Sequence, residues 1–148
     1  MQFGIRDEEF IRGKVPMTKA EIRAMVMVKA GIRPEDRVAD IGAGTGSISI
    51  EAALVASKGE VYSIERNPEG IRLIEENAEK FGLKNIHTIK GVAPAAMDGL
   101  PPLDVVIIGG SSGNMHEILD RAEELLPKGG RMVLTAVTAE TTGEVVRE

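Results

Sequence analysis

The sequence has 148 residues, with no cysteine, no tryptophan and only 3% aromatic residues. Without cysteine, the chain forms no disulfide and offers no thiolate to zinc, which favours the cytoplasm as its compartment. Its two histidines, His87 and His116, are too few and too far apart for a zinc site, and we expect no metal. The scarcity of aromatic side chains argues against a surface on which nucleic-acid bases stack.

Long apolar runs are missing as well. No stretch of about 18 apolar residues is present, so we expect no membrane span. Residues 1–14 are charged and lack the apolar segment of a secretory signal. The net charge of −5 argues against a nucleic-acid partner, which usually requires a basic surface. The remaining composition, with 43% hydrophobic and 28% charged residues, is typical of one globular domain.

Short apolar runs typical of strands alternate along the chain with longer helical patterns. The predicted strands are residues 37–41, 60–64, 86–90, 104–108 and 131–136. Several are apolar throughout, as expected for strands covered on both faces. Such alternation predicts an α/β fold with a doubly wound, mainly parallel sheet.

The helical patterns carry start and stop signals. Thr18 and Glu21 have the spacing of a capping box, and we expect an apolar stripe to follow it. The residues that follow at helical spacing are the apolar Ile22, Met25 and Val26, together with Lys29. Asn67 before a proline predicts the start of another helix, and Gly82 predicts its end. The expected core face of this helix is Ile71, Ile74, Ala78 and Phe81. A further stripe, residues 118–126, precedes the fifth strand.

The most informative segment is residues 40–46, Asp-Ile-Gly-Ala-Gly-Thr-Gly, between the first strand and a helix. Glycines allow a tight turn and a close approach of a ligand, and a helix N-terminus offers unpaired N–H groups. A dinucleotide fingerprint would need glycine where Ser47 stands. The pattern instead resembles the first motif of the class I S-adenosylmethionine (SAM)-dependent methyltransferases, whose Rossmann-like fold we therefore expect. In that family this loop lies against the methionine part of SAM.

Two later segments support a nucleoside site. Glu65 ends the second strand about twenty residues beyond the loop, where an acidic side chain accepts hydrogen bonds from ribose hydroxyls. The resemblance implies that the backbone around Gly91 and Ala93 faces the adenine edge. Many methyltransferases carry aspartate where this chain has Val92, so one adenine contact is expected to be missing. Residues 126–130 resemble the glycine-containing turn that precedes the fifth strand in these enzymes.

The N-terminal residues 3–19 narrow the resemblance. Together with the segments 67–69 and 108–111, they resemble the decarboxylating precorrin carbon-15 methyltransferases of cobalamin biosynthesis, which also occur as the C-terminal half of precorrin-6Y methyltransferase. The resemblance implies SAM-dependent methylation of a precorrin tetrapyrrole at carbon 15, coupled to loss of carbon dioxide from the ring C acetate. It also implies a homo-oligomer, commonly a tetramer, and leaves open a carbon-5 methyltransferase partner. Whether the tetrapyrrole carries cobalt stays open.

The expected organisation is an N-terminal arm for substrate or oligomer contacts, residues 1–17, followed by the SAM-binding domain, residues 18–148. The cofactor-binding candidates are Thr18, Asp40, Gly42, Ala43, Gly44, Thr45, Gly46, Glu65, Arg66, Gly91 and Ala93. The substrate-binding candidates are Arg6, Arg12, Lys14, Gly109, Gly110 and Ser111. The three basic residues are expected to bind substrate carboxylates. The sequence identifies no catalytic residue.

The family resemblance breaks off at Glu148, soon after the fifth strand. Class I methyltransferases add a helix and an antiparallel hairpin there, which we expect to be absent. A sheet edge would then be exposed, so we expect low stability or dependence on oligomer contacts.

Three alternatives stay open: an RNA or other small-molecule methyltransferase on this fold, a non-catalytic SAM-binding module, and, more remotely, a dehydrogenase. The chain lacks an Asn-Pro-Pro-aromatic motif after the fourth strand, which argues against methylation of base amino groups.

Overall fold

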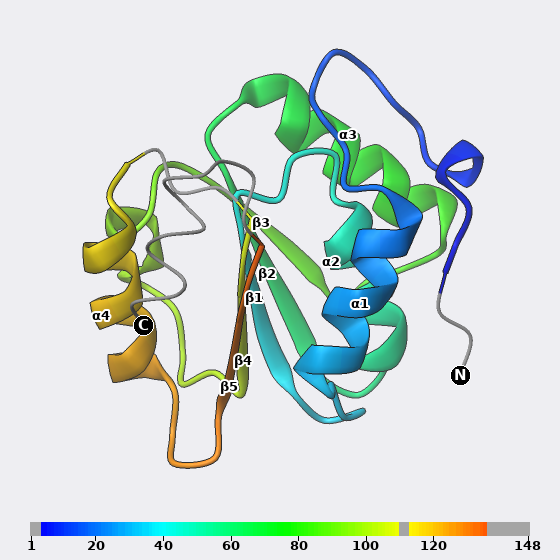
Figure 1. Ribbon diagram of the computed structural model, residues 1–148. Coiled ribbons are helices and arrows are strands. Elements are labelled where there is room, and N and C mark those ends of the chain that lie inside the picture. The colour runs from blue at the N-terminus through cyan, green and yellow to red at the C-terminus, as the bar shows by residue number, and fades with distance from the viewer. Residues whose placement is uncertain (1–3, 110–112, 136–148) are drawn as a thin grey trace.

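The computed structural model describes residues 4–109 and 113–135, and these form a three-layer α/β structure (Figure 1). Its five strands are β1 (Arg37–Ile41), β2 (Glu60–Glu65), β3 (Ile86–Lys90), β4 (Val105–Ile108) and β5 (Arg131–Leu134). They pair in parallel in the order β3-β2-β1-β4-β5. The chain therefore builds outward from β1 to one edge and then returns to build the other. This confirms the predicted doubly wound fold.

Four helices cover the two faces of the sheet. They are α1 (Ala20–Ala30), α2 (Ser47–Val55), α3 (Pro68–Lys80) and α4 (Met115–Leu125), with short 3-10 turns η1 (Asp7–Glu9) and η2 (Ala95–Met97). Helices α1, α2 and α3 lie on one face and α4 on the other (Figure 1). Two apolar cores result, one beneath α1 and α2 and one beneath α4 and η2. No helix in the described part of the chain combines the length and apolarity needed to cross a bilayer.

The predicted strands agree with the structure to within two residues wherever both can be compared. The second strand extends one residue further, to Glu65, and the fourth begins one residue later, at Val105. The fifth ends at Leu134, and Ala136 lies outside the described residues. Asn67 caps α3 as predicted, because its Oδ1 accepts a hydrogen bond from the Glu69 amide at 2.9 Å. Gly82 adopts the expected left-handed conformation just after that helix, with φ of 67°.

The predicted start of α1 is wrong, and of its predicted core face only Val26 is buried. Lys19 is the N-cap residue and no side chain caps this helix, so the capping box does not form. The buried residues are Arg23, Val26, Met27 and Ala30. Ile22 and Met25, which were expected in the core, are exposed. The reason is Arg23, which is fully buried and turns a different face of the helix inward.

The core face of α3 differs from its prediction in a similar way. Its buried residues are Gly70, Leu73, Ile74 and Asn77, so only Ile74 of the predicted stripe is buried. Gly70 packs against the side chain of Glu65 and the carbonyl of Gly44, where a Cβ would come within 2.9 Å of that carbonyl oxygen. This close approach sets the rotation of α3 about its axis. The stripe predicted on α4 is confirmed at Ile118, Leu119 and Ala122.

Residues 4–18 form an N-terminal strap that crosses α3 and reaches α1 (Figure 1). Asn77 holds it by accepting a hydrogen bond from the Ile11 amide at 2.7 Å and donating one to the Ile11 carbonyl at 3.1 Å. Arg23, with 0% exposure, pairs through Nε with Glu51 at 2.5 Å and donates to the carbonyls of Ile5 and Thr18. A buried ion pair with this many partners fixes one position of the strap, because a lost partner would leave an unpaired charge in the interior.

Candidate functional site

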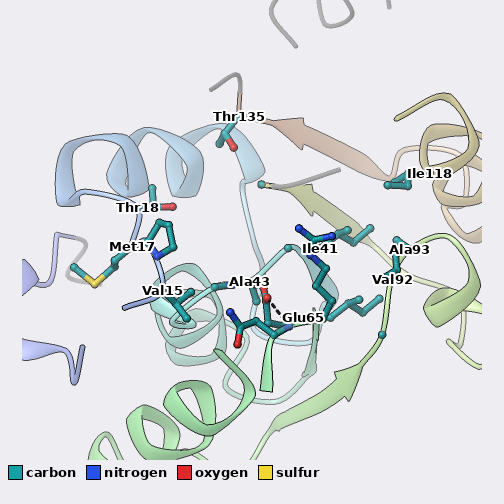
Figure 2. Close-up of a pocket in the computed structure, with 18 of the residues that line it drawn as sticks. Val15, Met17, Thr18, Ile41, Ala43, Glu65, Val92, Ala93, Ile118 and Thr135 are labelled. Atoms are coloured by element: carbon teal, nitrogen blue, oxygen red, sulfur yellow. Dashed lines mark hydrogen bonds between the residues drawn. The ribbon is translucent and has the colours of Figure 1, made fainter. Parts of the chain in front are cut away.

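A cavity of about 790 Å³ opens at the carboxyl ends of the strands, between β1 and its neighbours. This is where the strand order reverses, the usual ligand position in open α/β sheets. In Figure 2, Val15 and Thr18 of the strap lie on one side of the cavity and Val92 and Ala93 on the opposite side. Glu65 lies between them. The volume is within the range of small-molecule sites.

The glycine-rich turn forms part of this wall. Gly42, Gly44 and Gly46 have φ angles of 74°, 59° and 87°, a left-handed conformation that favours glycine. The Gly42 amide donates to the Ile64 carbonyl at 2.9 Å, which ties the turn to β2. A Cβ on Gly44 would come within 3.0 Å of the Pro16 carbonyl oxygen, so the turn and the strap are in close contact. The glycines thus allow two backbone segments to meet beside the cavity.

Glu65, at the end of β2, faces the cavity and is 9% exposed. Its Oε1 accepts a hydrogen bond from the Gly44 amide at 2.8 Å, and its Oε2 accepts one from the Asn67 amide at 3.0 Å. An ionised carboxylate can accept about four hydrogen bonds. Glu65 therefore orders the glycine-rich turn and keeps acceptor capacity for a ligand with neighbouring hydroxyl groups.

Asp40 lies on the adjacent strand, buried beneath the turn rather than in the cavity lining. Its Oδ2 accepts a hydrogen bond from the Ser49 hydroxyl at 2.6 Å, and Ser49 also hydrogen-bonds Ser63 at 2.6 Å. Burial raises the pKa of Asp40 to about 6, the Ser49 hydrogen bond opposes this rise, and the nearby Glu65 charge adds to it. Asp40 thus connects the end of β1 to α2 through Ser49, and Ser63 extends this contact to β2.

The opposite wall holds the residues predicted to face adenine. Gly91, Val92 and Ala93 line the cavity, and the following bond, Ala93–Pro94, is cis. The Asn114 side-chain amide donates to the Ala93 carbonyl at 2.5 Å, which connects this loop to the start of α4. The wall is apolar and backbone-rich, and it suits a flat base more than a charged group.

Nine of the predicted site residues line the cavity. They are Thr18, Gly42, Ala43, Gly44, Glu65, Arg66, Gly91, Ala93 and Gly109. Six others lie outside the lining: Asp40, Thr45, Gly46, Arg6, Arg12 and Lys14. Gly110 and Ser111 fall outside the described residues. Within the described residues, no three acidic or histidine side chains gather as a metal-ligand set.

Sequence reasoning missed several lining residues. Lys19, Asn67 and Thr135 contribute polar groups, and Val15 and Ile118 contribute apolar ones. Lys19 adjoins Thr18 in the motif that had been singled out, so the motif itself could have identified it. The strap residues carry no periodic signal, because their position depends on contacts with α1 and α3 that are distant in sequence.

Comparison with known proteins gives this cavity a context. Residues 9–148 match the precorrin methyltransferase domain family. The chain belongs to this family. It is 45% identical to a probable cobalt-precorrin-6B C(15)-methyltransferase (decarboxylating) of Saccharolobus solfataricus, over 97% of this chain and 74% of that protein. It is 42% identical to the cobalt-precorrin-6B C(15)-methyltransferase (decarboxylating) of Salmonella typhimurium, over 92% of this chain and 70% of that protein.

A solved structure agrees with these relatives. The precorrin-6Y C5,15-methyltransferase of Geobacter metallireducens superposes with a TM-score of 0.93 at 39% identity, covering 98% of this chain and 78% of that one. The predicted family and the Rossmann-like fold are confirmed. As a member of the precorrin methyltransferase domain family, the chain is an enzyme and a methyltransferase.

Proposed function

We propose that this chain uses SAM to methylate a precorrin tetrapyrrole at carbon 15, with decarboxylation of the ring C acetate, in cobalamin biosynthesis. The observation that carries the proposal is the cavity at the reversal of strand order, with Glu65 at its centre, in a chain of this family. When bound, SAM supplies a methyl group activated by a positively charged sulfur.

The residues present fit such a cofactor. Glu65 has free acceptor capacity for the two ribose hydroxyls. The turn at Gly42 and Gly44 exposes backbone beside it, where the methionine part would lie. Val92 and Ala93 offer an apolar wall for adenine. Thr18, on the opposite side, adds a hydroxyl-bearing side chain to the lining.

The chemistry requires positioning more than acid–base catalysis. Bound SAM would supply the methyl carbon for the new bond to carbon 15 and would leave as the neutral thioether, and the methylene left by loss of carbon dioxide from the acetate would take up a proton. Holding the two reacting carbons in line within a shielded cavity can supply much of the rate. The strap and the glycine-rich turn provide that shielding, because Gly44 and Pro16 are in close contact.

The substrate carries several carboxylates, so cations at the cavity are needed to bind it. Arg6, Arg12 and Lys14 were expected in this role, but all three are exposed on the strap outside the lining. The cations that line the cavity are Lys19 and Arg66. We assign the binding of substrate carboxylates to Lys19 and Arg66. Arg12 and Lys14 would contact only those parts of the substrate that lie outside the cavity.

The test combines two measurements on the wild-type chain. Calorimetry should detect SAM binding, and binding of NAD in its place would contradict the proposal. Incubation with SAM and a precorrin-6B substrate, with and without cobalt, should then give a product that has gained one methyl group and lost one carbon dioxide by mass spectrometry. SAM binding without either mass change would favour a non-catalytic module. Lys19→Ala should weaken substrate binding and leave SAM binding intact.

A further inference from the structure

The lining of the cavity divides into two halves, because β1 lies in the middle of the sheet. Gly42, Glu65 and Ala93, which are assigned to SAM, lie at the ends of β1, β2 and β3. Gly109 and Thr135 follow β4 and β5, which lie on the opposite side of β1 from β2 and β3. In Figure 2, Thr135 lies at the upper side of the cavity and Glu65 at the lower side. A ligand bound by Glu65 therefore leaves the β4–β5 side of the cavity for a second molecule.

Helix α1 borders this second side. Arg131 at the start of β5 donates through Nε to the carbonyl of Ala30, the last residue of α1, at 2.7 Å. The end of α1 is thus held at the start of β5, so the start of α1 points toward the end of β5, where Thr135 lies. Lys19 and Ile22, from the start of α1, line the cavity as Thr135 does. Lys19, Ile22, Gly109 and Thr135 together form the β4–β5 half of the cavity.

Ile22 presents an apolar side chain to this half. It is 45% exposed, because the adjoining Arg23 is buried and directs its own side of the helix into the protein. Of the five large hydrophobic side chains exposed in the described part of the chain, Ile22 and Val92 line the cavity. Val92 lies in the half assigned to the cofactor, and Ile22 lies in the other. An exposed apolar side chain in a cavity lining is typical of a ligand contact.

We infer that Ile22 is a specificity-determining residue, which contacts an apolar face of the tetrapyrrole ring in the β4–β5 half of the cavity. This inference rests on the proposed function. A precorrin combines a large ring that has apolar faces with carboxylates at its edge. Lys19 precedes Ile22 by three residues and lines the same half, so the start of α1 offers an apolar contact and a cation side by side. A small polar methyl acceptor would gain nothing from Ile22.

The experiment measures binding of precorrin-6B to the full chain by equilibrium dialysis, with S-adenosylhomocysteine in place of SAM so that no turnover occurs. Ile22→Asn and Ile22→Ala should each raise the dissociation constant for precorrin-6B roughly five- to tenfold, because the ligand no longer covers the exposed part of an isoleucine. Ile22→Val should stay within about twofold of the wild type. The dissociation constant for SAM, measured by calorimetry, should not change in any of the three variants.

Val28→Asn is the matched control, because Val28 is a 70% exposed apolar residue of the same helix that lies outside the cavity lining. It should bind both ligands as the wild type does, and an equal loss of precorrin binding there would overturn the inference. Circular dichroism shows that each variant folds.

A folded Ile22→Ala that binds precorrin-6B as the wild type does would overturn the inference and leave the proposed function intact. An equal loss of SAM affinity would also overturn it, since Ile22 would then belong to the cofactor half. A wild type that binds SAM but no precorrin-6B would reject the proposed substrate, and the inference with it.

Discussion

Glu65 and Asp40 are acidic residues on neighbouring strands, and their surroundings give them different roles. Glu65 lines the cavity and accepts hydrogen bonds from two backbone amides, one of them in the glycine-rich turn. Asp40 is buried behind that turn and bonds only to Ser49 within the described residues. The first is suited to a ligand, and the second is suited to joining β1 to α2.

Glu65→Gln tests the first role. The amide cannot accept at both positions, so the variant loses a charge-assisted hydrogen bond either to the turn or to the ribose. Such bonds contribute about 1.5–3 kcal/mol, so the dissociation constant for SAM should rise roughly ten- to hundredfold, measured by calorimetry. Glu76→Gln, exposed on α3, is the control and should bind as the wild type does. Unchanged affinity in Glu65→Gln would remove this residue from the SAM site.

Asp40→Asn tests the second role through its pH dependence. The pKa of Asp40 is raised to about 6, so the folded state binds a proton more tightly than the unfolded state does. The Asp40 contribution therefore favours folding most below about pH 4, and it is lost as the pH rises from 4 through 6. The cost of the ionised form at neutral pH is about 3 kcal/mol. The free energy of unfolding, measured with urea, should fall less over this range in Asp40→Asn than in the wild type.

The control for this experiment is Asp120→Asn, an exposed substitution on α4. The free energy of unfolding of Asp120→Asn should change with pH as that of the wild type does. If Asp40→Asn also followed it, the ionisation of Asp40 would not be coupled to folding, and its burial beneath the turn would need another explanation.

At the residue scale, spacing alone predicted Glu65, because a carboxylate about twenty residues beyond a glycine-rich turn has one established position in this architecture. Thr135 was missed because it reaches the cavity from the end of β5, far beyond the glycine-rich turn in sequence. The Arg23–Glu51 pair was missed for the same reason. Nothing in the local sequence indicates that an arginine will form an ion pair with a buried carboxylate 28 residues away.

At the scale of single elements, contacts between segments override helical periodicity. The stripe predicted for α1 pointed Ile22 and Met25 inward, whereas the buried ion pair of Arg23 turns them outward. The stripe of α3 is shifted because Gly70 and Asn77 meet the glycine-rich turn: Gly70 contacts Gly44, and Asn77 donates to the Thr45 carbonyl at 3.1 Å. Both shifts occur where a helix packs on the site.

The close contact between Gly46 of the turn and Ile74 of α3 predicts how a substitution there changes stability. A Cβ on Gly46 would be 2.8 Å from Ile74 Cγ1 and would also be strained at φ of 87°. Gly46→Ala should therefore lower the free energy of unfolding by more than about 2 kcal/mol, measured with urea. Gly82→Ala is a matched control, because Gly82 has φ of 67° but no atom within 4 Å of the added Cβ. Gly82→Ala should lower the free energy of unfolding by only about 1 kcal/mol. Equal losses in both variants would show that the Ile74 side chain moves aside at little cost.

At the scale of the whole molecule, the alternation of strands and helices was enough to predict the parallel sheet, because right-handed crossovers leave few other arrangements. The position of the cavity follows from that topology, because the cavity lies where the order of the strands across the sheet reverses. The strap does not follow from it. Its place over α3 depends on the paired hydrogen bonds between Ile11 and Asn77, which join residues 66 positions apart.

The central claim is methyl transfer to carbon 15 of a precorrin with loss of the ring C acetate carboxyl group. The most direct test is nuclear magnetic resonance of the product made by this chain from SAM with a carbon-13-labelled methyl group. The account predicts a single labelled methyl group bonded to carbon 15 and a methyl group in place of the ring C acetate. A label at another carbon, on a nitrogen or on an oxygen, or an intact acetate in the methylated product, would contradict it.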